Sequence, residues 1–175
     1  MKNHAIKSGV MIGVIGIIIT LLLYIVDPTT FAKWWLMMLL GVLNLTLIAV
    51  FGVKYRNEIG GFMSFKDAYV YSLITMVVMV LVGTLFSIVM FNVVDPGISE
   101  TVADAVAENT ESMMRNFGAP EDGMDEAIDK ARADTLDRFT MVGMIKGAGI
   151  RILINVVFCL ILGAIIKKNE PELEG

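Results

Sequence analysis

The distribution of apolar and polar residues divides the chain into four long apolar runs and one charged stretch. The first run, 9–26, contains 18 residues and no charge, and a helix needs about 20 residues to cross the hydrocarbon core of a bilayer. Further apolar runs follow at about 34–53, 68–94 and 148–166. The pattern therefore predicts four membrane-spanning helices.

The ends of these runs carry signals that fit spans. The first run is longer than the apolar core of a secretory signal peptide, which is about 7–15 residues, and the following "DPTTFAKWW" offers no clear small-residue cleavage site. We therefore expect the first run to be retained as a span. Pro28 favours a helix end just before it. Trp34 and Trp35 open the second run, as is typical of the membrane interface.

The last apolar stretch as a whole, 141–166, contains two basic residues, Lys146 and Arg151. Its uncharged part, 152–166, has only 15 residues, so a span of normal length must include Arg151 near one end. Long basic side chains can reach lipid headgroups from such a position. Lys146 and Arg151 are therefore candidate contacts for lipid headgroups, and an acidic partner is the alternative.

The charged stretch, 95–140, lies between the third and fourth runs. Residues 99–118 begin with a serine and end with a glycine, which are helix start and stop signals. A second amphipathic segment follows at about 125–139. We expect an extramembrane helical hairpin. An apolar stripe at helical spacing marks its first helix, and could pack on the second hairpin helix, the membrane surface or a partner subunit. This candidate partner face consists of Val102, Val106, Met113 and Phe117.

Composition supports this interpretation. Hydrophobic residues make up 56% of the 175 residues, whereas soluble domains contain about 45–50%, and the mean hydropathy is +0.72. We predict an all-α integral membrane four-helix bundle with an extramembrane amphipathic helical hairpin, organised as one membrane domain over 1–175.

Charge predicts the orientation in the membrane. With the N-terminus in the cytoplasm, seven basic residues flank the inner span ends and two to four flank the outer ends. Cytoplasmic loops carry the excess of Lys and Arg in membrane proteins. We therefore expect both termini in the bacterial cytoplasm and the hairpin outside the cytoplasmic (inner) membrane. The hairpin stretch holds twelve acidic and four basic residues, which agrees with this placement but does not prove it.

The short segment "EIGGFMSFKDAY" (58–69) separates the second and third runs. Its two glycines permit a sharp turn. A serine followed three residues later by an aspartate resembles a capping box at a helix start. The segment is a candidate structural motif, and a cytosolic docking or ligand site is the alternative. The residues concerned are Gly60, Gly61, Phe62, Ser64, Phe65 and Asp67.

The four-span layout, the "GGFMSFKDAY" motif and the long charged loop together resemble an uncharacterised family of small bacterial four-helix integral membrane proteins, grouped as a domain of unknown function. In that family a glycine–aromatic–x–Ser–Phe stretch precedes the third span, matched here by Gly61, Phe62, Ser64 and Phe65. The segment "GMDEAIDKA" is similar to the family's acidic loop helix. The resemblance implies a fold and a location, and it brings no activity and no catalytic residues.

The inventory of reactive residues is small. Cys159 is the single cysteine and His4 the single histidine, which excludes an intrachain disulfide and leaves few ligands for zinc. We expect Cys159 to pack in the core and His4 to be solvated or at headgroup level. Ser64 has no histidine partner in its motif. We expect no cofactor, no metal site and no nucleic-acid partner.

Three functional classes remain. The sequence favours a non-catalytic membrane scaffold or interaction protein, with the lipid bilayer and a second copy or another membrane protein as partners. A small-molecule or ion transporter would need a water-accessible cavity around Asn44 and Asn155. A membrane enzyme would have to use the polar groups around Ser64 and Asp67.

Overall fold

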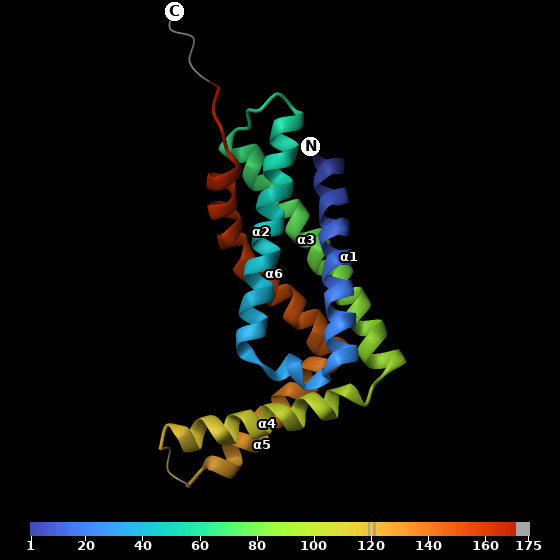
Figure 1. Ribbon diagram of the computed structural model, residues 1–175, viewed down its shortest axis with the longest axis vertical. Helices are drawn as coiled ribbons and strands as arrows, with labels where there is room; N and C mark the ends of the chain where they lie inside the picture. The colour runs from blue at the N-terminus through green and yellow to red at the C-terminus, as the bar shows by residue number, and fades with distance from the viewer. Residues whose placement is uncertain (119, 121, 171–175) are drawn as a thin grey trace, which may run out of the picture. The chain divides into compact units, whose positions relative to one another are not determined.

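A computed structural model describes residues 1–118, 120 and 122–170 and has an all-α architecture over that part (Figure 1). A 3₁₀ helix, η1 (Pro28–Ala32), follows the first α-helix, and a π-helical turn, η2 (Met90–Val94), follows the third. The predicted all-α fold is confirmed. The six α-helices of the described residues are α1 (Lys2–Val26), α2 (Trp34–Glu58), α3 (Phe65–Val89), α4 (Ile98–Asn116), α5 (Met124–Phe139) and α6 (Met141–Ile166).

Four of the helices are long and apolar enough to span a membrane: α1, α2, α3 together with η2, and α6. The helices α4 and α5 form an additional hairpin between α3 and α6. The protein is therefore a multi-pass membrane protein. Two of the long helices extend beyond the predicted apolar runs: α1 begins at Lys2 and α6 begins at Met141. A helix keeps its backbone hydrogen-bonded through the interface, while flanking basic side chains can reach water.

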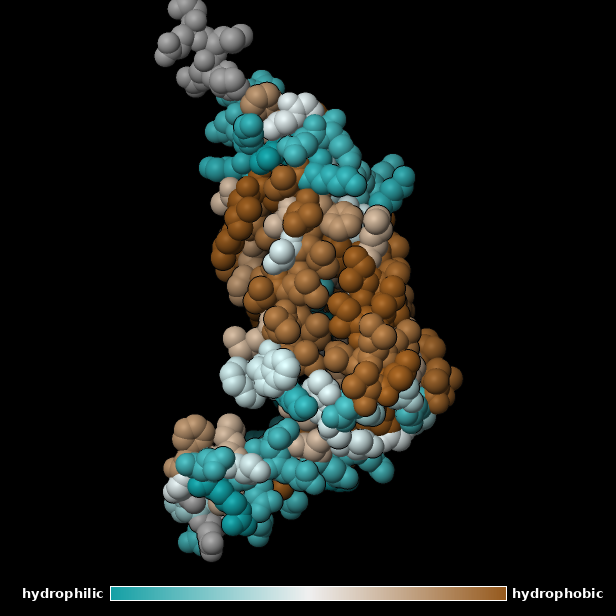
Figure 2. Space-filling view, in the orientation of Figure 1, coloured by the Kyte–Doolittle hydropathy of each residue, from teal (hydrophilic) through white to brown (hydrophobic). Residues whose placement is uncertain are grey.

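The outer surfaces of the long helices are apolar (Figure 2). Ile25 is 75% exposed and Leu153 is 72% exposed, although both are large aliphatic residues. A contiguous apolar exterior of this kind marks contact with lipid. The spans therefore contact the lipid bilayer.

Packing divides the described chain into two compact units. Unit 1 contains Met1–Ile17, Leu40–Gly83 and the chain from Ala148 onwards, and unit 2 contains Ile18–Leu39 and Thr84–Gly147. Each unit draws a segment from all four long helices. Unit 2 also contains the α4–α5 hairpin.

Unit 1 is a closely packed set of four helical segments. Its core contains Ile12, Met76, Cys159 and Ile166, each 0% exposed, and Cys159 is thus the packing residue that the sequence predicts. The segments of α1 and α3 approach very closely, since a Cβ added to Gly9 would lie 2.6 Å from the carbonyl oxygen of Thr75. Small residues permit such close approach of two backbones in a membrane.

Unit 2 is built around aromatic side chains. The ring of Phe91 meets those of Phe31 and Phe139 edge to face, with centroid distances of 6.1 and 5.4 Å. The π-helical turn η2 carries Asn92, whose Nδ2 donates to the carbonyl oxygen of Phe139 at 3.2 Å. The turn therefore connects the end of the third span to the junction of α5 and α6.

The hairpin is held to unit 2 through α4, which packs on η1 and on α5. Arg132 of α5 forms an ion pair with Asp104 of α4, with 2.6 Å between Nε and Oδ1. Asp27 caps η1 by accepting the Thr29 N–H at 2.9 Å and the Thr29 hydroxyl at 2.7 Å. These bonds from the Thr29 hydroxyl and amide hold the pKa of Asp27 below its ordinary value.

Candidate functional site

One end of unit 1 gathers four chain segments that are distant in the sequence. The start of α1 at Lys2, the end of α2 at Glu58, the start of α3 at Phe65 and the end of α6 at Ile166 all lie there (Figure 1). The N-terminus and the C-terminal end of the described chain are therefore on the same side as the "EIGGFMSFKDAY" segment.

The segment between α2 and α3 forms a glycine turn followed by a capped helix. Gly60 and Gly61 have positive φ angles of 105° and 88°, which few other residues adopt without strain. The Asp67 N–H donates to Ser64 Oγ at 3.1 Å, which is the predicted helix-cap hydrogen bond. The Ser64 hydroxyl in turn donates to Asp67 Oδ2 at 2.7 Å, so the aspartate side chain engages the serine itself.

The same segment is fastened to the end of α6. Met63 and Lys168 exchange two backbone hydrogen bonds, each 2.9 Å long. Arg56 Nη1 donates to the carbonyl oxygen of Ile166, the last residue of α6, at 2.9 Å. Phe65 packs on α6 where Gly163 leaves room, because a Cβ there would lie 3.2 Å from the Phe65 ring. The motif thus joins three helices at one end of the unit.

A surface cavity of about 570 Å³ opens beside this motif. Its walls combine apolar side chains with both signs of charge. Lys168 Nζ lies 5.5 Å from the centre of the Phe62 ring, which is within range of a cation–π interaction. The lining residues are Met1, Tyr55, Ile59, Phe62, Met63, Ser64, Asp67, Lys168, Asn169 and Glu170.

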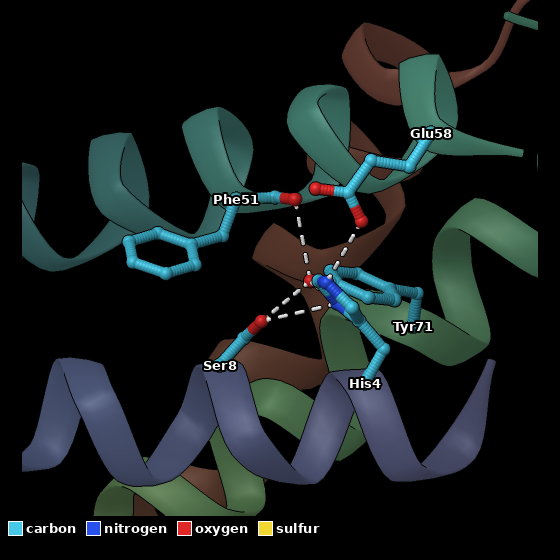
Figure 3. A network of polar contacts seen from close by, with 5 residues as sticks. All are labelled: His4, Ser8, Phe51, Glu58 and Tyr71. Atoms are coloured by element: carbon cyan, nitrogen blue, oxygen red, sulfur yellow. Dashed lines mark hydrogen bonds and ion pairs between the residues drawn. The ribbon is translucent and has the colours of Figure 1, made fainter.

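A polar network of five residues lies in unit 1 (Figure 3). The hydroxyl of Tyr71, a residue that is 0% exposed, lies 2.8 Å from Ser8 Oγ and 3.2 Å from His4 Nδ1. It donates to the carbonyl oxygen of Phe51 at 3.3 Å. On its other side His4 Nε2 lies 3.3 Å from Glu58 Oε2. The network connects α1, α2 and α3.

Tyr55 forms the wall between the network and the cavity. Its ring stacks on that of Tyr71 with 5.2 Å between centroids and 8° between planes, and it lies 4.4 Å from the His4 ring. Tyr55 also lines the cavity. A molecule bound in the cavity would therefore contact a ring that the network holds in place.

The order Ser8–His4–Glu58 has the composition of a serine–histidine–acid relay. Its geometry does not favour nucleophilic catalysis. Ser8 is 1% exposed, so a substrate carbonyl group cannot approach its oxygen. Ser8 Oγ also lies 3.4 Å from His4 Nδ1 but only 2.8 Å from the Tyr71 hydroxyl, whereas an activated nucleophile is within close hydrogen-bond reach of its base. The arrangement is suited to joining helices.

Among the residues that the structure describes, no group of three or more His, Cys, Asp or Glu side chains is placed to hold a metal ion. Charged side chains at the cavity, such as Asp67 and Lys168, could instead pair with charged groups of a bound molecule.

The remaining sequence candidates lie outside the cavity. Lys146 and Arg151 are exposed on α6, and their contact with lipid headgroups stays a prediction. The apolar stripe of α4 divides in two: Val102 is 2% exposed and packs in the core of unit 2, whereas Phe117 is 84% exposed. Val106 is partly buried against the same core, and Met113 is 52% exposed.

Sequence reasoning missed the polar network. His4 was expected to be solvated or at headgroup level, but its side chain is only 30% exposed and contacts Glu58 and Tyr71. The side chain is therefore not freely solvated, because α1 begins at Lys2 and carries His4 into the packed face; its position at headgroup level stays a prediction. The available signal was the spacing of His4 and Ser8, four residues apart on one face of α1.

Comparison with known proteins gives one match. The model of a family described as "Protein of unknown function (DUF4199)" matches residues 7–168, nearly the whole chain. No curated protein and no solved structure matches the chain. The matched range contains the four spans, the hairpin and the motif between α2 and α3.

Proposed function

The chain belongs to the DUF4199 family of proteins of unknown function, and we propose that this member is a non-catalytic interaction protein of the bacterial cytoplasmic membrane. Its proposed binding site is the cavity of about 570 Å³ where both described chain ends and the α2–α3 motif meet. That cavity is the observation that carries the proposal. The partner is a peptide segment of another membrane or cytosolic protein.

The chemistry of the cavity supports a peptide partner. Tyr55, Ile59 and Phe62 present apolar surface, and Asp67 and Lys168 place charges of opposite sign beside it. Interfaces that bind protein combine an apolar centre with a polar rim. An amphipathic segment with one large apolar side chain and a flanking charge would match both features.

The orientation is part of the proposal. The chain segments at the cavity end include Lys2, Lys54, Arg56, Lys66 and Lys168, all near span ends. An excess of basic residues marks the cytoplasmic side of a membrane protein. The cavity would therefore face the cytoplasm.

The interior of unit 1 supports interaction rather than transport. Its centre is filled by apolar side chains such as Ile48 and Met76. Asn155 Nδ2 donates to the carbonyl oxygen of Arg151 in its own helix at 2.8 Å, so this amide is satisfied without a ligand.

A fluorophosphonate probe, which labels activated serines, tests the proposal that the protein is non-catalytic. The probe should leave Ser8 unlabelled. Labelling that disappears in Ser8→Ala would contradict the proposal.

Photo-crosslinking in native membranes tests the proposed binding. A photoreactive residue at Ile59, which lines the cavity and is 48% exposed, should give a discrete adduct with one partner protein. Lys54 is exposed on α2, which ends at Glu58 just before Ile59, and does not line the cavity, so the same photoreactive residue there is the matched control. The adduct should be lost in Phe62→Ala, since this change removes the ring at the cavity wall.

Two results would contradict the proposal. One is equal adducts from positions 59 and 54, which would indicate random collision. The other is an adduct at 59 that Phe62→Ala leaves unchanged. A cysteine at position 59 should also react with an impermeant thiol reagent only after the inner face is opened, and labelling from outside would overturn the orientation.

A further inference from the structure

The apolar stripe of α4 continues beyond the core that its first half helps to form. Phe117 is the C-cap residue of α4, directly after its last residue, Asn116. With a turn of about 100° per residue continued to this position, Val102, Val106, Met113 and Phe117 lie within about 60° of one another. They therefore share one face. Figure 2 shows apolar side chains gathered on one side of the distal end of the hairpin, whereas hydrophilic side chains cover most of its remaining visible surface.

The first half of this face is turned toward the spans. Val102 and Ile98 are each 2% exposed and pack in one core with Met90 and Phe91. Leu21 of α1 and Phe31 of η1 pack against that core. The direction in which the α4 stripe points is thus fixed, within unit 2, by contact with the ends of the spans.

The second half of the face extends past these contacts. At a rise of about 1.5 Å per residue, Met113 and Phe117 lie about 16 and 22 Å beyond Val102 along the helix axis. They point in nearly the same direction as Val102 and yet are 52% and 84% exposed. Met113 and Phe117 are therefore exposed apolar side chains on the face that packs, nearer the start of α4, against the span ends of unit 2.

We propose that the distal half of α4 rests on the bilayer, with Met113 and Phe117 inserted into its interfacial layer. The exposed end of the third span lies only a few residues before α4 in the chain. Val93 and Val94, which end the third span, are 73% and 64% exposed, and α4 begins only four residues later at Ile98. Trp34, 72% exposed at the start of α2, adds a residue type favoured at the membrane interface.

The charge of α4 indicates the kind of lipid surface. Its polar faces carry Asp104, Glu108 and Glu111, and Arg115 is paired with Glu111. Amphipathic helices that require anionic lipid carry basic polar faces. Insertion of α4 would therefore rely on its apolar side chains and would occur on a zwitterionic surface. This inference does not depend on which side of the membrane carries the hairpin.

Site-directed spin labelling of the full chain in phosphatidylcholine vesicles tests the proposal. The label is placed at position 117 and, as the control, at Glu108, an exposed position on another face of the same helix, with Cys159→Ala as the background. Oxygen concentrates in the bilayer and a nickel chelate stays in water. We expect the ratio of oxygen to nickel accessibility to be at least about threefold higher at 117 than at 108, as for a residue at the headgroup–acyl boundary.

Two outcomes would overturn the proposal. Equal ratios at 117 and 108 would place Phe117 in water. Low accessibility to both reagents at 117, with dipolar broadening between labels, would mean that a second copy covers the face. Because Phe117 is 84% exposed, its replacement should leave the fold intact. Position 113 provides a second label, and its high ratio should fall to that of position 108 when Phe117→Glu is introduced.

Discussion

The two units bury different kinds of group. Unit 1 holds hydroxyl groups in its interior: Ser8, Ser72 and Thr75 are each at most 1% exposed. Each has a partner, since Ser72 donates to the Ala68 carbonyl oxygen and Thr75 to that of Ala5. Unit 2 fills its core with Met, Phe, Ile and Val side chains, and its Asp104–Arg132 ion pair lies at the surface. Its buried hydroxyl is that of Thr135, which is 6% exposed and donates to the Ala131 carbonyl oxygen of its own helix.

The difference follows from the two solvents that surround the protein, the lipid bilayer and water. Within a bilayer the exterior of a span is as apolar as its interior, so burial of aliphatic surface gives little drive for helices to associate. Close approach at small residues and buried hydrogen bonds then hold the helices together, as at Gly9 and Tyr71 in unit 1. Much of unit 2 is the hairpin and the connections between helices, where water makes the burial of Ile98 and Val102 favourable.

The first and largest of the effects compared between the units concerns the close approach of α1 and α3 backbones in unit 1. Gly9→Ala should lower the free energy of unfolding by about 1–3 kcal/mol, since its Cβ would lie 2.6 Å from the Thr75 oxygen and 2.7 Å from Val78 Cβ. Gly16→Ala on the same helix meets no atom within 4 Å. It should be neutral or stabilise by about 0.5–1 kcal/mol. Denaturant titration in bicelles measures the free energy of unfolding of both variants. Equal destabilisation by Gly9→Ala and Gly16→Ala would show that close approach at Gly9 does not matter for stability.

The next largest loss in the free energy of unfolding is expected where a buried hydroxyl group is removed. Tyr71→Phe removes the hydroxyl that contacts Ser8, His4 and the Phe51 carbonyl, and we expect a loss of about 1–2 kcal/mol. Tyr24→Phe in unit 2 is the counterpart, because its hydroxyl donates only to Asp95, at 2.8 Å. Its loss should be smaller, since water can replace this partner near the end of a span. A larger loss for Tyr24→Phe would reverse the comparison.

Several features of the fold could be predicted from sequence because each leaves a local signal. Long uncharged runs predict the spans, and the stripe of Val102, Val106, Met113 and Phe117 predicts the amphipathic helix α4. The spacing of Ser64 and Asp67 predicts the cap of α3. All three signals depend on residues within one helix or its first turn.

The remaining features depend on which face of each span turns inward. Lipid-facing and core-facing residues of a span are both apolar, so the pattern leaves the rotation of the helix undetermined. The contact of Ser8 with Tyr71, 63 positions apart, depends on that rotation. The pairing of Met63 with Lys168 uses backbone groups alone, which every residue type except proline can supply. Both residues line the cavity, so a wall of the cavity depends on a pairing that the sequence does not signal.

The smallest expected effect is a pH dependence at the surface of unit 2. Asp27 accepts two hydrogen bonds from Thr29, and these lower its pKa from the ordinary value of 3.8. A pKa that is lower in the folded than in the unfolded chain stabilises the fold at pH values above the unfolded pKa. The contribution is lost as the pH falls through the folded pKa, when the carboxylate is protonated.

Asp27→Asn separates this titration from that of other acidic groups. Asparagine keeps a side-chain oxygen for the cap but does not titrate, and all other carboxyl groups are common to both proteins. The difference in thermal midpoint between wild type and Asp27→Asn should be constant above about pH 5, and the wild type should lose stability relative to the variant as the pH falls below about 4. A constant difference over the whole range would show that the Thr29 bonds do not favour the charged form. The buried hydroxyl groups of unit 1 do not titrate in this range, so Tyr71→Phe should show no matching change.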